Sequence, residues 1–440
     1  MAYVPKHRRL KIRWKVAAPL LILLMLCVYM LVSVLHSVVS PEPKRFTICD
    51  FSNDKTVERL SKKYQSTYKM SDYLYYGETL NLMQNPYNPE VADPLSGKTV
   101  QFNNICTGEK FPFVFENAVD RQVALDELTV GYYEIFVIDD LQPKRAVYAT
   151  PLKDTDFTTV KRKDKVNQIS LIADQNLLKK DYKKFLDQNY LFLEVKETDP
   201  KDKQVDVLLD PSGYNKDFTY TVDKGVEANG LVEYEENYKA AVELKKALEK
   251  YGLRVMITRD KMNQALNTYG KEGRLGKAYA SKARYMFHIG QSESTYDSVK
   301  GMEIYYSNHA SATFANALLY DLKKNTQLTG NVAYATDLDN AGVMSADLVE
   351  GVDGRKIYDG DMYIRESGGR ATIAGSYSEN AAKQNASFAK DNKQGIQTLS
   401  IYYSYFTNKQ DAAYWKSDRA KIMNATANSI ARMLHVEKTK

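Results

Sequence analysis

The stretch that decides the fold of the larger part of this chain is Val205-Asp206-Val207-Leu208-Leu209-Asp210-Pro211. Its short apolar run ends in Asp-Pro, which predicts a buried strand that leads into a turn. An apolar stripe follows at steps of three and four residues, formed by Tyr234, Tyr238, Ala241, Leu244, Leu248 and Tyr251. This spacing predicts a helix, and Gly252 stands where a glycine commonly ends one.

The alternation of strand and helix continues toward the C-terminus. Strands are expected at 253–258, 285–289, 302–306 and 396–405, and helices at 274–283, at 312–324 and around 423–434. Alternating strands and helices indicate an α/β fold with a mostly parallel sheet flanked by helices. We assign residues 204–437 to this domain, which is long enough to bury a full core.

The N-terminus has the pattern of a single membrane anchor. Residues 16–39 form an apolar run of 24 residues without a formal charge, and residues 1–15 hold six Lys and Arg. About 20 apolar residues span a bilayer, and Lys and Arg beside a span tend to stay in the cytoplasm. A cleaved signal peptide is the alternative, but its apolar region is usually shorter and ends in a small-residue cleavage site. We therefore predict a cytoplasmic basic tail at 1–15, a transmembrane helix at 16–39 and an extracytoplasmic bulk.

Between the anchor and the α/β domain, two further regions are expected. Residues 40–75 are polar and predict a stalk, and residues 76–200 predict a small β-rich domain, either a sandwich or a barrel. Its expected strands are aromatic or β-branched runs near 111–115, 132–138, 169–172 and 190–195. Such a domain suits either a glycan- or protein-binding module or a plain spacer.

Charge and cysteine content limit the function classes. The net charge is +6, and the six basic residues of the tail account for it, so the rest of the chain is neutral and no nucleic-acid partner is expected. Cys49 and Cys106 lie in the extracytoplasmic part, where they either pair or stay as buried thiols, and Cys27 lies in the predicted span.

Seven short motifs occur in a fixed order through the α/β region. They are Asp210-Pro211-Ser212-Gly213-Tyr214; Gly230-Leu231-Val232-Glu233 with Asn237-Tyr238; Thr258-Arg259-Asp260; Arg274 with Ala278; Ala283 to Gly290; Gly301-Met302-Glu303-Ile304-Tyr305-Tyr306; and Tyr402 to Asn408 with Asp411. In this order, residues 205–436 resemble the zinc-dependent N-acetylmuramoyl-L-alanine amidases of bacterial cell walls. The resemblance implies an amidase-like fold and a role in peptidoglycan metabolism.

The same resemblance implies a zinc site that this sequence does not reproduce. The family's ligands are His, Glu and His, and a late-strand Glu handles the proton. The matching positions hold Gly213, Glu233, Gly290 and Tyr402. Glycine has no side chain to bind zinc, and tyrosine with a pKa near 10 is a poor base at neutral pH. We therefore expect a degenerate member with no catalytic residue and no cofactor.

A rearranged zinc site is the alternative. His288 lies two residues before Gly290 on the same strand face, and Glu233 with Asp217 or Asp223 would complete a ligand set. The opposing interpretation is a structural His288 and a Glu233 that stabilises a helix N-terminus. His309 is expected to face solvent, and His435 to lie at the end of the last helix.

Binding residues are expected around the former catalytic groove. Tyr214, Tyr234, Tyr402 and Tyr403 would hold a sugar–peptide, and Arg365 and Glu366 would meet it from the long polar segment before Ile396. The main hypothesis is a non-catalytic protein that binds peptidoglycan or a cell-wall assembly protein. One alternative is an active amidase that hydrolyses the lactyl-L-alanine amide bond with a rearranged zinc site. The other is a purely structural role in assembly.

Overall fold

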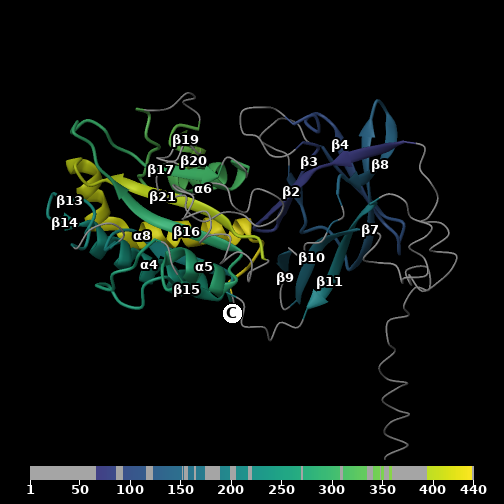
Figure 1. The fold of residues 1–440 in the computed structure, drawn as a ribbon. Helices are drawn as coiled ribbons and strands as arrows, with labels where there is room; N and C mark the ends of the chain where they lie inside the picture. Colours follow the sequence, from purple (N-terminus) through teal and green to yellow (C-terminus); the bar gives the residue numbers. More distant parts are fainter. Residues whose placement is uncertain are drawn as a thin grey trace, which may run out of the picture.

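The computed structural model shows a β-rich domain followed by an α/β domain, which lie side by side in Figure 1. It describes residues 66–85, 93–114, 122–150, 152, 157–162, 165–173, 189–198, 205–216, 221–268, 271–307, 311–333, 340–346, 348–350, 356–358 and 394–438. The predicted transmembrane helix at 16–39 lies outside these ranges. Within them, no helix is both long enough and apolar enough to cross a membrane.

The β-rich domain packs two sheets around one core. An eight-stranded sheet has the order β1-β8-β7-β11-β10-β9, with β4 on β7 and β5 on β4, and a second sheet has the order β2-β3-β6. Tyr75 and Leu82 of the second sheet share one apolar cluster with Val100 and Ile135 of the first. The strands are β1 Thr67–Met70, β2 Asp72–Tyr76, β3 Thr79–Met83, β4 Thr99–Asn104, β5 Lys110–Val114, β6 Gln122–Ala124, β7 Gly131–Asp139, β8 Gln142–Tyr148, β9 Thr158–Arg162, β10 Lys165–Ala173 and β11 Leu191–Thr198.

The predicted boundary between stalk and β-rich domain is wrong. β1 and β2 fall inside residues 40–75, which the sequence analysis assigned to a stalk. All five residues of β2, Asp-Tyr-Leu-Tyr-Tyr, are buried. Lys69 within β1 and Asp72 within β2 interrupt an aromatic pattern that is typical of strands, so the sequence pattern did not reveal them. Cys106 of the β-rich domain is disulfide-bonded, and the other two cysteines, Cys27 and Cys49, lie outside the described residues.

The α/β domain has the predicted alternation of strand and helix. Its six-stranded sheet has the order β15-β12-β16-β21-β17-β18, and only the β17–β21 pair is antiparallel. Its elements are β12 Val207–Pro211, β13 Glu227–Ala228, β14 Leu231–Val232, α4 Glu233–Glu249, β15 Val255–Ile257, α5 Arg274–Ser281, β16 Tyr285–Ser292, β17 Glu303–Ser307, α6 Thr313–Asn325, β18 Val343–Ala346, β19 Leu348–Glu350, β20 Lys356–Tyr358, β21 Gln397–Tyr405 and α8 Lys409–Met433.

Alternation along β12 assigns the two faces of this sheet. Val207 and Leu209 pack in the large core with residues of α4, α6 and α8, whereas Leu208 packs with Leu275 of α5 in a smaller cluster. Successive side chains of a strand point to opposite faces, so α4, α6 and α8 cover one face and α5 covers part of the other. Asp210 and His288 follow Leu208 and Met286 at even steps and lie on the α5 side. This partly polar face carries the candidate site.

Candidate functional site

The carboxyl ends of the central strands bring the four family-matched positions together. The Ser212 amide donates to the Ile289 carbonyl (2.8 Å), which places the segment after β12 beside the end of β16. Gly290 pairs in register with Tyr402 of β21, and Tyr234, next to Glu233, lies against Gly213. Ligands of α/β proteins commonly bind at this edge of a sheet. The fold therefore keeps the positions of an active site.

Gly213 stands in a backbone conformation that excludes most side chains. Its φ of +79° lies in the left-handed region, and a Cβ there would be 2.8 Å from Tyr234 Cβ and 3.1 Å from the Lys224 carbonyl oxygen. Only glycine adopts such a φ at little cost. A histidine at this position would need both the turn and helix α4 to move.

At Gly290, a side chain from the neighbouring strand takes the place of a ligand. A Cβ on Gly290 would lie 2.6 Å from Tyr402 Cε1, so the tyrosine ring occupies the volume of the absent side chain. The Tyr402 ring also contacts the Tyr305 ring edge-on, with 5.8 Å between the ring centroids, and its centroid lies 6.1 Å from that of the His288 ring. The residue at the proton-handling position thus fills the site of the second histidine.

Glu233 uses its carboxylate to close the turn before α4. Its Oε2 accepts from the Val226 amide (2.8 Å), and its Oε1 accepts from Asn237 Nδ2 (3.2 Å). The side chain is buried, and Glu233 is the first residue of the helix. A carboxylate is favourable there because helix N-termini carry partial positive charge. This geometry agrees with the structural interpretation of Glu233.

His288 is paired with Asp210, which the sequence analysis did not predict. His288 Nδ1 lies 2.9 Å from Asp210 Oδ2, on adjacent strands and in register. The other carboxylate oxygen, Oδ1, accepts from Thr258 Oγ1 (2.6 Å) and from Arg274 Nη1. Both His288 and Asp210 are buried. A carboxylate inside an apolar strand requires partners, and that is the signal in the sequence that could have found this pair.

Two buried arginines hold the turn that follows β12. Arg274 donates to the carbonyls of Pro211 (3.0 Å) and Gly213 (2.8 Å) and to Asn215 Oδ1 (2.8 Å). Arg259 Nη2 donates to the carbonyls of Ser212 (3.2 Å) and Tyr234 (3.1 Å). The turn's carbonyl oxygens therefore face guanidinium groups.

These contacts set the charges of the site. Burial raises the pKa of Asp210, but Arg274 and the His288 hydrogen bond outweigh it and hold that pKa well below its ordinary value. Burial, with Arg274 close by, lowers the pKa of Arg259 to about 10. Arg259 and Asp210 are therefore charged at neutral pH, and because Asp210 is ionised, His288 Nδ1 donates in the pair.

A second buried carboxylate lies farther along the same sheet face. Glu303 Oε1 accepts from Asn331 Nδ2 (2.5 Å) and from the Tyr405 hydroxyl, and its Oε2 accepts from Ser292 Oγ and the Tyr305 hydroxyl (both 3.3 Å). Four donors satisfy this carboxylate within the protein. The polar face thus carries two bonded clusters, one around Asp210 and one around Glu303.

The residues present do not fit the zinc ion that the resemblance implies. Gly213 and Gly290 offer no ligand atom and no room for one, and the Glu233 carboxylate is bound to its own turn. Within the part of the chain that the structure describes, no cluster of three or more His, Cys, Asp and Glu side chains could hold a metal ion. A site with three protein ligands and an open position is therefore not formed by these residues.

The remaining predicted site residues divide into three groups. Tyr214 and Tyr234 are brought together as predicted, with ring centroids 4.6 Å apart and both rings partly exposed. The prediction of Tyr403 as a binding residue is wrong, because its side chain is fully buried. Its ring centroid lies 5.6 Å from that of Trp415, on the sheet face that α4, α6 and α8 cover. Asp217, His309, Arg365 and Glu366 lie outside the described residues.

Asp223 and His435 have local roles. Asp223 is exposed and its Oδ1 accepts from the Gly225 amide (2.9 Å), so it stabilises a turn and does not reach the zinc positions. His435 follows α8 as predicted, and its Nε2 lies 3.7 Å from Asp126 Oδ2 of the β-rich domain.

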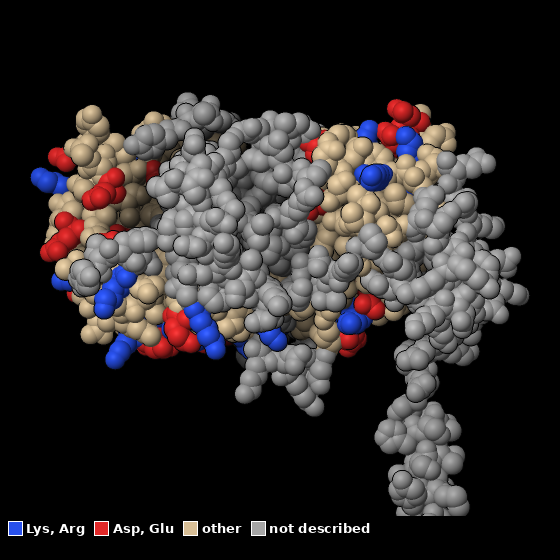
Figure 2. Space-filling view, in the orientation of Figure 1, with Lys and Arg blue, Asp and Glu red and all other residues tan. Residues whose placement is uncertain are grey.

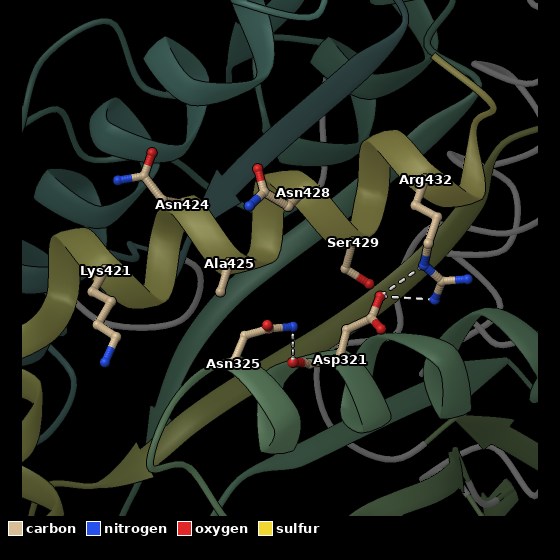
Figure 3. A pocket seen from close by; sticks show the side chains of 8 residues that line it. All are labelled: Asp321, Asn325, Lys421, Asn424, Ala425, Asn428, Ser429 and Arg432. Carbon is tan, nitrogen blue, oxygen red and sulfur yellow. Dashed lines mark hydrogen bonds and ion pairs between the residues drawn. The ribbon is translucent and has the colours of Figure 1, made fainter. Parts of the chain in front are cut away.

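A cavity of about 420 Å³ lies between α6 and α8, away from the polar face (Figure 3). Its lining groups bond to one another: Arg432 Nη2 donates to Asp321 Oδ2 (2.7 Å), and Asn325 Nδ2 donates to the Asp321 carbonyl (2.8 Å). On the face of the α/β domain that Figure 2 shows, the described Lys, Arg, Asp and Glu side chains are interspersed. The lining of the cavity includes none of the residues of the candidate site.

Comparison with known families identifies one related segment. Residues 207–352 match the sequence model of the N-acetylmuramoyl-L-alanine amidase family. The matched segment contains Gly213, Glu233 and Gly290 and ends before β21. A search of curated proteins found no match.

Solved amidase structures also match the α/β part of the chain. The catalytic domain of CwlV from Bacillus (Paenibacillus) polymyxa var. colistinus is 18% identical with a TM-score of 0.36, and the match covers 53% of this chain and 100% of that one. AmiC2 of Nostoc punctiforme is 17% identical with a TM-score of 0.35, covering 52% and 97%. Ami1 of Mycobacterium smegmatis is 15% identical with a TM-score of 0.36, covering 52% and 97%.

Proposed function

We propose that this chain is a membrane-anchored, extracytoplasmic protein of bacterial cell-wall metabolism that binds peptidoglycan without hydrolysing it. The family match over residues 207–352 supports the substrate class, because the name of the family specifies the muramoyl–alanine bond of peptidoglycan. The apolar run at 16–39, preceded by six basic residues, supports the anchor and its orientation.

One observation carries the non-catalytic part of the proposal. The volumes that two zinc-binding histidines would need are closed, at Gly213 by Tyr234 and the backbone turn and at Gly290 by the Tyr402 ring. A lost ligand leaves an empty space, whereas here the replacement residues fill it. Catalytic zinc needs three protein ligands and an open position, and this arrangement supplies neither.

The same replacements leave an aromatic surface at the mouth of the former site. Tyr214, Tyr234 and Tyr402 are each partly exposed. A tyrosine presents an apolar ring face and a hydroxyl group, which suits a ligand that has both sugar rings and peptide groups. The buried arginines behind Tyr234 are bonded to the turn, so ring contacts are expected to contribute more to binding than ion pairs.

The test is sedimentation of the purified chain with insoluble peptidoglycan. The wild-type chain should pellet, and no muropeptide product should appear in the supernatant. Tyr214→Ala should reduce the pelleted fraction several-fold, because it removes one ring of the exposed pair. Tyr320→Ala removes a tyrosine that is 63% exposed on α6, on the other side of the sheet, and should pellet like the wild type.

Two outcomes would contradict this proposal. A chain that stays in the supernatant at every peptidoglycan concentration does not bind the polymer, and a partner protein would then become the favoured ligand. Release of muropeptides that is lost in Glu233→Ala would show a working hydrolase with a rearranged metal site.

A further inference from the structure

Four charged side chains from both domains meet where the domains join. Arg284 of the α/β domain contacts Glu78 of the β-rich domain through Nη1, and its Nη2 lies 2.9 Å from Asp206 Oδ1. Lys161 of the β-rich domain completes the set, with its Nζ 2.8 Å from Asp206 Oδ2. Each domain contributes one cation and one anion. We call Glu78, Lys161, Asp206 and Arg284 the junction network.

Burial makes the junction network interdependent. Arg284 is 2% exposed, Asp206 4% and Glu78 8%. Burial disfavours the charge on Arg284, but Glu78 and Asp206 outweigh it and raise its pKa above the ordinary value. Buried charges are tolerated only when they are paired, so each member requires the others to stay in place.

Direct hydrogen bonds join the domains beside this network. The Gly395 amide donates to the Phe157 carbonyl (2.8 Å), and Gln394 Nε2 donates to Thr159 Oγ1 (2.7 Å). The Glu78 amide donates to the hydroxyl of Tyr285 (3.2 Å). Gln394 also forms an isolated parallel β-bridge with Phe157. Strand-like pairing between two domains fixes their relative position more tightly than side-chain contacts alone.

Two glycines allow the domains to approach this closely. A Cβ on Gly77 of the β-rich domain would lie 2.7 Å from Tyr285 Cε1, and a Cβ on Gly395 would lie 2.6 Å from Tyr75 Cβ. On the α/β side, the charged network, the Gln394 and Gly395 contacts and the Tyr285 contacts come from residues before or at the start of β12, β16 and β21, and Gly252 and His435 add contacts outside these strands. The β-rich domain is therefore packed against the amino ends of these strands, at the edge opposite to the candidate site.

From this geometry we infer that the two domains form one cooperative folding unit, in which the junction network prevents the α/β domain from swinging on the β-rich domain. The β-rich domain is then a rigid platform and not a freely tethered module. The carboxyl edge of the α/β sheet points away from that platform in a fixed direction. This inference concerns the coupling of the domains and does not depend on what the candidate site binds.

The experiment compares the unfolding of the two domains in the full chain. The purified chain in detergent micelles is titrated with urea, and hydrogen exchange is read by mass spectrometry at β3 of the β-rich domain and β16 of the α/β domain. In the wild type, both strands should lose protection at the same urea midpoint. Arg284→Met leaves Glu78 and Asp206 without their shared partner and should separate the two midpoints by at least about 0.5 M.

Arg145→Met is the matched control. Arg145 is 1% exposed, and its Nη1 donates to the carbonyls of Ile135 (2.8 Å) and Leu191 (2.6 Å), all within the β-rich domain. In a coupled unit, this change should lower the midpoints of β3 and β16 together.

Three results would overturn the inference. They are separate midpoints in the wild type, coincident midpoints in Arg284→Met, or a fall of the β3 midpoint alone in Arg145→Met. If Arg284→Met does not fold, Glu78→Gln keeps the side-chain shape and removes one charge, and the same separation of midpoints is expected on a smaller scale.

Discussion

At Gly290, a residue of the neighbouring strand fills the space that a metal-binding side chain would need. The Tyr402 ring lies where a Cβ and the rest of a histidine would stand, and the ring is held by Tyr305 on its other side. At Gly213, the turn itself and Tyr234 leave no space. Neighbouring atoms fill the side-chain space at both glycines. A change of one glycine alone to histidine should therefore destabilise the fold and should not by itself restore catalysis.

This fit predicts a strong coupling between positions 290 and 402. Gly290→Ala should destabilise the protein by about 1–3 kcal/mol, because the new methyl group overlaps the Tyr402 ring. Tyr402→Ala creates room for that methyl group. The loss of unfolding free energy in the double variant should therefore be smaller than the sum of the two single losses, by about 1 kcal/mol or more. Urea unfolding of the four proteins measures this. Additive free energies would show that the ring does not fill the site of residue 290.

Individual residue roles were only partly predictable from the sequence. The sequence was sufficient to predict which residues stand at the four family-matched positions, because those positions lie in motifs with a recognisable order. The predicted binding role of Tyr403 was wrong. Consecutive strand residues face opposite sides of the sheet, and Tyr402 lies on the side of the candidate site, so Tyr403 lies on the other. The Asp210–His288 pair was missed, because it joins two strands whose register a single sequence does not specify.

Among the elements, β12 and α5 support the candidate site together. β12 carries Asp210 near its carboxyl end, and Arg274 is the first residue of α5. The pKa values of Asp206, just before β12, and Asp210 are both held below their ordinary value, because Arg284 with Lys161 at Asp206, and Arg274 with His288 at Asp210, outweigh the effect of burial. Ionised carboxylates thus attach this central strand to its neighbours.

Stability should therefore fall in acid. A carboxyl group whose pKa is lower in the folded than in the unfolded state stabilises fully above the unfolded value of about 3.9, and this contribution is lost as the pH falls toward the folded value. We expect the free energy of unfolding to decrease between pH 5 and pH 3, and urea unfolding across this range measures it.

Asp210→Asn tests the origin of that dependence. It should cost about 3–5 kcal/mol at pH 7, because it leaves Arg274 without its buried partner, and it should weaken the decrease in acid. Asp223→Asn changes an exposed carboxylate and is the matched control, with a cost below about 1 kcal/mol. An unchanged pH dependence in Asp210→Asn would assign the acid sensitivity to other groups.

The elements of the α/β domain were predictable, whereas β1 and β2 were not. The strands and helices after Val205 have long apolar runs or clear helical periodicity, so composition and spacing identify them. β1 and β2 are short, and Lys69 and Asp72 interrupt their tyrosines. β1 and β2 belong to different sheets, and their burial follows from the packing of these two sheets against each other, which is a tertiary effect that local pattern does not contain.

For the whole molecule, the order of the domains was predictable but their junction was not. Glu78 and Arg284 are 206 residues apart in the chain, and neither belongs to a local motif that would indicate a partner. The structure places that junction at one end of the parallel strands and the candidate site at the other. We propose that the domain containing the amidase-like segment 207–352 is held rigidly at this junction and presents an aromatic surface at the matched positions.

The central claim, that the candidate site at the family-matched positions holds no zinc, is tested most directly by metal analysis. The purified chain is loaded with zinc under mild conditions, desalted and measured by elemental analysis, with Glu233→Ala and His288→Ala treated in parallel. We predict less than about a tenth of an equivalent in all three proteins, because two ligand positions are glycines whose space is filled. About one equivalent in the wild type that is lost in both variants would contradict the account and establish a rearranged metal site.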